Sequence, residues 1–131
     1  MRDTEIVNAR ITRTEIGIHE RGFFTWSMLC EWSGSGCSFG GYVLDAYEKK
    51  DEKLPVYMKG HKGHADGILV IRQILETCGV ESWEDLKGTY VRVESEGLGG
   101  GIVAIGHIIE NKWFNPVQFF NAAKEAENGT I

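Results

Sequence analysis

The feature that most constrains the fold is a strongly alternating stretch that leads directly into a glycine-dense segment. Over residues 24–32, Phe, Trp, Met, Cys and Trp occupy every second position, with mostly small or polar residues between them. A two-residue period of this kind is typical of a β-strand with one face packed on a core. The next segment, at 33–41, reads SGSGCSFGG, and it is followed by Tyr42-Val43-Leu44, which we predict to be a third strand. The chain therefore has to reverse direction within the glycine segment.

Further strands are predicted on both sides of this pair. Val7, Ala9 and Ile11 alternate with polar residues, and a turn follows at residues 20–22. Residues 90–94 and 102–105 flank a glycine-rich stretch at 97–101, which predicts a hairpin. Residues 46–63 are rich in charge and contain a proline. We expect a solvated loop there, with a short strand at 56–58.

The first predicted helix covers residues 64–77. Ile68, Ile71 and Leu75 recur at helical spacing, and Gly79 is placed to end the helix in a left-handed conformation. A single capped turn is expected at residues 82–85, with the Ser82 side chain as its cap.

The second predicted helix begins at Asn115-Pro116, because Asn is a favoured N-cap and Pro fits the first helical position. The resulting order is βββ-α-ββ-α. It predicts one α+β domain over residues 1–131, in which an antiparallel sheet carries two helices packed on one face.

Composition narrows the functional classes. A net charge of −5 over 131 residues argues against a general nucleic-acid binder, which needs clustered Lys and Arg. Three cysteines are an odd count without a disulfide framework and fit reduced thiols, although Cys30 and Cys37 are close enough in sequence to meet across a turn. We find neither a leader-like apolar segment nor a run long enough to cross a bilayer, and expect a cytoplasmic protein.

The glycine segment allows two structural interpretations. Its pattern superficially matches a nucleotide-binding loop, but such loops open a helix, and this one opens into a strand. We favour the interpretation that it forms a bulged hairpin. The alternative is a nest of backbone amides facing an anion, with Phe39 or Tyr42 as a stacking face.

Motifs for metal or covalent chemistry are weak. The pair His61 and His64 would need further ligands for zinc, and only Cys78 and His107 are plausible donors. No nucleophile elbow or catalytic cysteine signature is present in the sequence. We therefore expect a protein that is not an enzyme and needs no metal or cofactor.

The stretch before the second helix is more suggestive of binding. Lys112 supplies a cation, Trp113 and Phe114 supply aromatic faces, and Arg92 lies on the polar side of its predicted strand. A base that stacks on an aromatic ring while a guanidinium pairs with phosphate would suit a nucleotide-like ligand. The alternative is that Trp113 and Phe114 form a hydrophobic staple for the helix.

Three segments of the chain, 33–45 (SGSGCSFGGYVLD), 79–94 (GVESWEDLKGTYVRVE) and 105–116 (IGHIIENKWFNP), resemble a widespread family of small phage and prophage proteins. Among such proteins, the chain resembles the anti-Thoeris sponge family in its expected function. That resemblance implies a homo-oligomer in the bacterial host cytosol. It also implies that the protein sequesters a cyclic ADP-ribose isomer without cleaving it and so blocks the defence signal of TIR enzymes. Some members of that family also hold cyclic oligonucleotides at a second site.

The sequence thus predicts a non-catalytic binder of a cyclic nucleotide-type signal. The candidate ligand-binding residues, chosen for their chemistry, are Phe39, Tyr42, Arg92, Lys112, Trp113 and Phe114. Two alternatives remain open: an inhibitor that covers a host defence enzyme with the acidic segment 45–52, and a phage accessory protein without a ligand.

Overall fold

The computed structural model describes residues 4–18, 22–47, 61–63, 65–96 and 101–128. Its elements, in chain order, are β1 (Glu5–Ile18), β2 (Phe24–Trp32), β3 (Ser35–Val43), β4 (Asp45–Tyr47), β5 (His61–Gly63), α1 (Ala65–Cys78), η3 (Trp83–Leu86), β6 (Tyr90–Ser95), β7 (Ile102–His107), β8 (Trp113–Phe114) and α2 (Pro116–Asn128).

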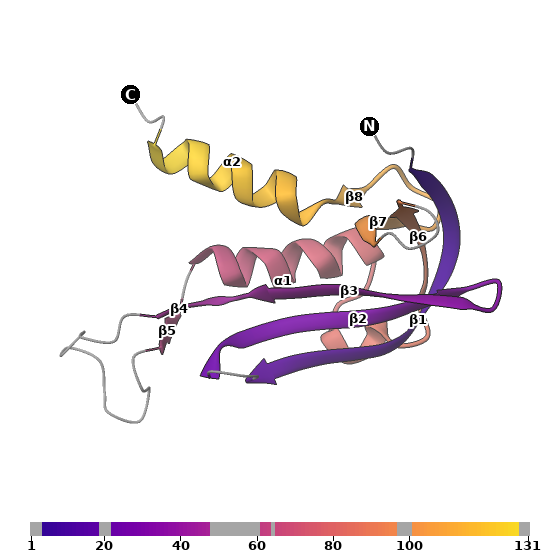
Figure 1. Ribbon diagram of the computed structural model, residues 1–131, viewed down its shortest axis with the longest axis horizontal. Helices are drawn as coiled ribbons and strands as arrows, with labels where there is room; N and C mark the ends of the chain where they lie inside the picture. Colours follow the sequence, from indigo (N-terminus) through magenta and orange to yellow (C-terminus); the bar gives the residue numbers. More distant parts are fainter. Residues whose placement is uncertain (1–3, 19–21, 48–60, 64, 97–100, 129–131) are drawn as a thin grey trace.

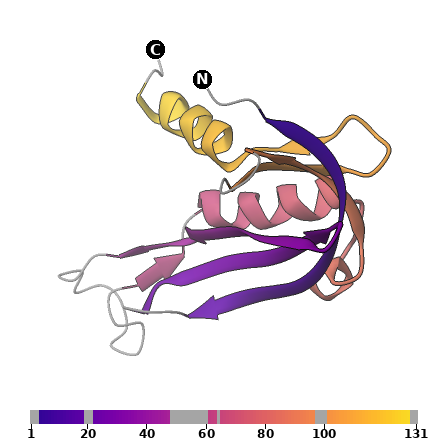
Figure 2. The same cartoon turned by 45° about the vertical axis from the view of Figure 1, so that its right-hand side comes forward.

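The architecture is a six-stranded antiparallel sheet with two helices, in the strand order β3-β2-β1-β6-β7-β8. The predicted α+β class is confirmed, and the short strand β8 makes the order βββ-α-βββ-α. Figures 1 and 2 show β1 curving across the molecule, with α1 on the concave side of the sheet. Within the described residues, no helix is long and apolar enough to cross a membrane.

Strand β1 pairs with two other strands because a bulge divides it into two halves. Its first half pairs with β6, from Glu5 opposite Ser95 to Arg10 opposite Tyr90. Its second half pairs with β2, and the register shifts between Ile11 and Arg13. The extra residue, Thr12, reverses the alternation, so odd positions face the helices before the bulge and even positions face them after it.

The glycine segment is mostly strand, which corrects the prediction that the third strand starts at Tyr42. Only Ser33 and Gly34 form the turn, with φ values of 46° and 76°, as a two-residue hairpin turn requires. The register then shifts so that Gly41 is the extra residue of a bulge, which confirms the bulged hairpin. At Gly40, a Cβ would lie 2.7 Å from the Trp26 ring. The group that approaches this glycine backbone is therefore the protein's own indole.

The core lies between the sheet and the helices and is centred on Trp26, which is fully buried. The ring centroids of Phe39, Tyr42 and Phe114 lie 5.3, 6.0 and 6.4 Å from that of Trp26. Burying such rings contributes most of the hydrophobic stabilisation of a domain of this size. No described group accepts a hydrogen bond from the buried Trp26 Nε1.

Helix α1 forms where the sequence predicts it but presents a different face to the core. Its buried residues include Gly67, Val70 and Ile74, whereas Ile68, which was predicted to be on the apolar stripe, is 73% exposed. The reason is the contact at Gly67, where the absence of a side chain lets the helix lie directly on the Leu44 carbonyl. That contact fixes the rotation of the helix about its axis.

Of the three caps predicted at helix ends, two are confirmed and one is wrong. Gly79 has φ +77°, and its N–H and that of Val80 both donate to the Leu75 carbonyl, which confirms the predicted cap. The Asn115 cap is also confirmed, because its Oδ1 accepts the Gln118 N–H at 3.1 Å. The predicted side-chain cap of Ser82 is wrong, because the Asp85 N–H is held instead by the Ser82 carbonyl at 3.1 Å.

Two short strands lie outside the main sheet. Residues 61–63, which were predicted to belong to a loop, form β5 and pair with β4. Backbone pairing does not depend on apolar side chains, so charge and glycine did not prevent it. The predicted strand at 56–58, most of the turn at 20–22, most of the glycine-rich turn at 97–101 and His64 lie outside the described residues.

Candidate ligand-binding surface

The sheet face that points away from the helices carries a row of residues from four strands. Asn8, Arg92, Gly106 and Trp113 stand opposite one another on β1, β6, β7 and β8. A Cβ on Gly106 would come within 2.7 Å of the Trp113 ring, so the missing side chain lets the indole lie over β7. The Arg92 Cζ then sits 4.9 Å from the centroid of that ring. We call this set the arginine–tryptophan row.

Arg92 is held in place by backbone carbonyls as well as by the ring. Its Nε donates to the His107 carbonyl and its Nη2 to the Glu110 carbonyl, each at 2.8 Å. These bonds close the turn between β7 and β8. A guanidinium has five N–H donors, so donors remain for a ligand after these two bonds.

The same turn carries a second cation. Lys112 Nζ lies 3.0 Å from Glu110 Oε2, and this hydrogen bond and charge, together with His107, hold the pKa of Glu110 below its usual value. His107 Nδ1 accepts the N–H groups of Ile109 and Glu110, which places its proton, in the neutral form, on Nε2. Most of the polar side chains of the turn therefore bond to one another.

An open hollow borders the arginine–tryptophan row. It has a volume of about 540 Å³ and lies where the β2–β3 turn projects past the point at which β1 leaves β2. This volume is within the range of roughly 300–1,000 Å³ that small-molecule sites occupy. The lining residues include Asn8, Arg10, Glu31, Trp32, Ser33, Gly34 and Tyr90. Asn8 is common to the hollow and to the row, so the two are continuous.

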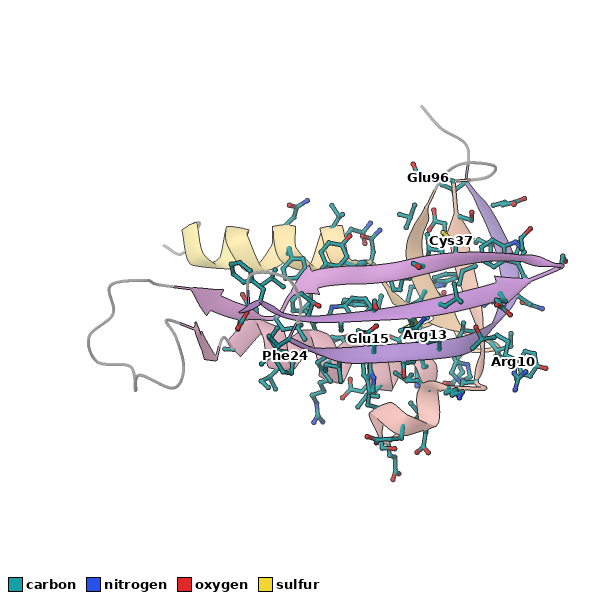
Figure 3. All side chains as sticks on the ribbon, turned by 60° about the horizontal axis from the view of Figure 1, so that its bottom comes forward. Arg10, Arg13, Glu15, Phe24, Cys37 and Glu96 are labelled. Carbon is teal, nitrogen blue, oxygen red and sulfur yellow. The ribbon has the colours of Figure 1, made fainter. Side chains whose placement is uncertain are left out.

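Arg10 and Tyr90 supply the most accessible binding groups of the hollow. They oppose each other in the β1–β6 register, and Glu31 opposes Arg10 from β2. Tyr90 is 61% exposed, which is high for an aromatic side chain on a sheet. Among the described residues, Arg10 takes part in no ion pair. Figure 3 shows Arg10 projecting at the end of the sheet next to the β2–β3 turn.

The six residues predicted from the sequence fall into two groups. Arg92, Lys112 and Trp113 lie together around the β7–β8 turn. The aromatic residues Phe39 and Phe114 are only 3% exposed, and Tyr42 packs against Trp26 and Phe120 in the core. Three candidate stacking residues therefore already pack on the protein itself.

Sequence reasoning missed Arg10 and Tyr90. A signal for both was present, because Tyr90 shares the polar side of its strand with Arg92, and Arg10 alternates with the inward-facing Ala9 and Ile11. What the sequence did not reveal is that β1 and β6 are neighbours, which brings these two residues together.

The three cysteines form a reduced cluster. Cys30 and Cys37 are directly opposite on β2 and β3, and all three cysteines are reduced thiols. Burial raises the pKa of Cys30 and of Cys78 to about 12, and at Cys30 the neighbouring Cys78 and Cys37 add to the effect. The described residues contain no group of three or more His, Cys, Asp or Glu side chains placed to hold a metal ion.

Compared with known proteins, the chain matches no family model, no curated protein and no solved structure.

Proposed function

We propose that this protein binds a small anionic ligand that carries an aromatic base, of the cyclic nucleotide type, and sequesters it without chemical change. The observation that carries the proposal is the exposed Arg10–Tyr90 pair beside a hollow of about 540 Å³. An aromatic face stacks on a base, and a guanidinium pairs with phosphate through parallel hydrogen bonds.

The arginine–tryptophan row extends the same surface. Arg92 and Trp113 add a second cation and a second ring next to Asn8, on the side of the hollow toward β8. Two cations suit a ligand with two phosphates, and an acidic protein needs such a local concentration of positive charge to attract an anion. A cyclic ADP-ribose isomer fits this description. Its capture in the cytosol of an infected bacterium would silence a TIR-based defence, as expected from the resemblance to anti-Thoeris sponges.

The test is titration calorimetry of the purified protein against cyclic ADP-ribose isomers and cyclic di- and trinucleotides. We expect binding to at least one of these ligands, with the ligand recovered intact by mass spectrometry after denaturation. Recovery of an altered ligand would show an enzyme instead, and no heat with any of them would refute the proposal.

Two variants test whether the ligand binds at the Arg10–Tyr90 pair. We expect Tyr90→Ala and Arg10→Ala each to weaken binding by about 1–3 kcal/mol, because one removes the stacking face and the other the phosphate partner. Arg72→Ala is the matched control, since Arg72 is an exposed arginine on α1 that pairs with Glu76 within its own helix. Equal affinities for all three variants would place the site elsewhere.

A further inference from the structure

The second half of β1 forms an edge of the sheet. As far as Ile11, β1 has partners on both sides, because the Ile11 N–H donates to the Thr89 carbonyl and its carbonyl accepts the Gly88 N–H. After the bulge at Thr12, residues 13–18 pair only with β2. No other described strand pairs with them, and Figure 3 shows β1 at the margin of this part of the sheet.

This edge carries apolar side chains on the side facing the helices. Ile16 is 38% exposed and Ile18 is 74% exposed, and Phe24, which opposes Ile18 on β2, is 38% exposed. In contrast, Trp26, which opposes Ile16, is fully buried. A strand edge with exposed β-branched residues is a template for a further strand.

We propose that the further strand is β1 of a second copy of this chain, paired antiparallel about a two-fold axis at Ile16. The proposal rests on this edge and not on ligand binding. Closed two-fold dimers are the commonest assemblies of identical chains, and they require a surface that is complementary to itself. Of the registers centred on residues 14, 15 and 16, the one centred on Ile16 fits the edge best.

Two other registers can be excluded on physical grounds. An axis at Thr14 would bring Gly17 of the partner subunit opposite Ile11, where Gly88 and Thr89 already occupy the backbone groups. An axis at Glu15 would set two Glu15 carboxylates directly opposite each other, and like charges in that position destabilise a strand pair.

An axis at Ile16 avoids both problems. It sets Ile16 against Ile16 of the partner subunit, and Thr14 against Ile18 of the partner subunit, on the side facing the helices. On the outer side, Glu15 meets Gly17 of the partner subunit, which carries no charge. The exposed apolar side chains at Ile16 and Ile18 are then covered in both copies, and this burial favours the pairing.

The first experiment measures the native mass by sedimentation equilibrium. We expect a dimer, or a multiple of it, at twice the chain mass of 14.7 kDa. Ile16→Lys should weaken association by roughly a hundredfold, because each copy loses a buried isoleucine and gains a like charge at the axis. Ile109→Lys is the control, since Ile109 is 82% exposed in the β7–β8 turn. A wild-type protein that is monomeric at micromolar concentrations overturns the proposal, as does equal weakening by the two variants.

The second experiment tests the register by oxidative crosslinking. Ile16→Cys should form a disulfide-linked dimer much faster than Glu15→Cys, because only residue 16 opposes its own copy. The wild-type protein under the same oxidant gives the background from Cys37, which is partly exposed. Faster crosslinking of Glu15→Cys, or no crosslinking of either variant above that background, contradicts the Ile16 register.

Discussion

The two faces of the six-stranded sheet have opposite characters. The face toward the helices is closed by fully buried residues such as Trp26, Val91 and Ile105. The outer face carries Arg92 over Trp113 and leads into an open hollow beside Tyr90. In the described parts of the chain, helices cover one face only, so stability is concentrated on that face, while the other is available for recognition. This division predicts that matched substitutions on the two faces have very different effects on folding.

The largest effect is expected at the contact between helix α1 and Leu44. Gly67→Ala should destabilise the protein by about 3 kcal/mol, because a Cβ would overlap the Leu44 carbonyl oxygen and force the helix away from the sheet. Gly17→Ala, on the outer side of β1, should change the stability by less than about 0.5 kcal/mol, since no atom lies within 4 Å of its Cβ position. Urea unfolding of both variants measures the difference. Similar losses would contradict the division between the faces.

A smaller effect is expected in the arginine–tryptophan row. Arg92→Ala should cost about 1–3 kcal/mol of stability, because two backbone carbonyls lose their donor and the Trp113 ring loses its cation. Tyr90→Ala should cost less than about 0.5 kcal/mol, because its side chain is largely exposed. Thermal unfolding of both variants provides the test. Equal stability of Arg92→Ala and the wild type would show that Arg92 has no structural role and would leave ligand binding as its only role.

The smallest perturbation concerns the cysteines and does not change the fold. At pH 8, iodoacetamide should modify Cys37 but neither Cys30 nor Cys78 in the folded protein. The reactive species is the thiolate, and a pKa of about 12 keeps the two buried thiols protonated at that pH. Mass spectrometry should find one added group in the native protein and three after denaturation. Rapid labelling of all three in the native protein would contradict the closed core.

Much of this fold follows from local patterns in the sequence. The alternation of residues 24–32 fixes β2, and the Asn115-Pro116 pair and Gly79 fix two helix ends, because each depends on neighbours in the chain. The rotation of α1 could not be predicted in this way. It depends on the Leu44 carbonyl, which contacts Gly67 only after the sheet and helix have packed.

The candidate site was even harder to predict from local patterns in the sequence. Arg92 and Trp113 were recognised as candidates, but Arg10 and Tyr90 were not. Their proximity depends on the pairing of β1 with β6, two strands that are far apart in the chain. The aromatic residues Phe39 and Phe114 were misleading for a related reason, because buried and exposed rings look alike in a sequence.

The position of β1 has a consequence for synthesis on the ribosome. It is the first strand to emerge and yet lies in the middle of the sheet, with Asn8 opposite Arg92. The β1–β2 and β2–β3 hairpins can form early, but the β6 side of β1 must wait until about 80 more residues have been added, at roughly 5–20 residues per second. For several seconds, the β1 edge of the nascent three-stranded sheet, which β6 later covers, is open to other chains. Contacts between residues this far apart in the sequence also slow refolding. Rapid synthesis of β6 shortens the time during which the nascent chain can aggregate through this edge.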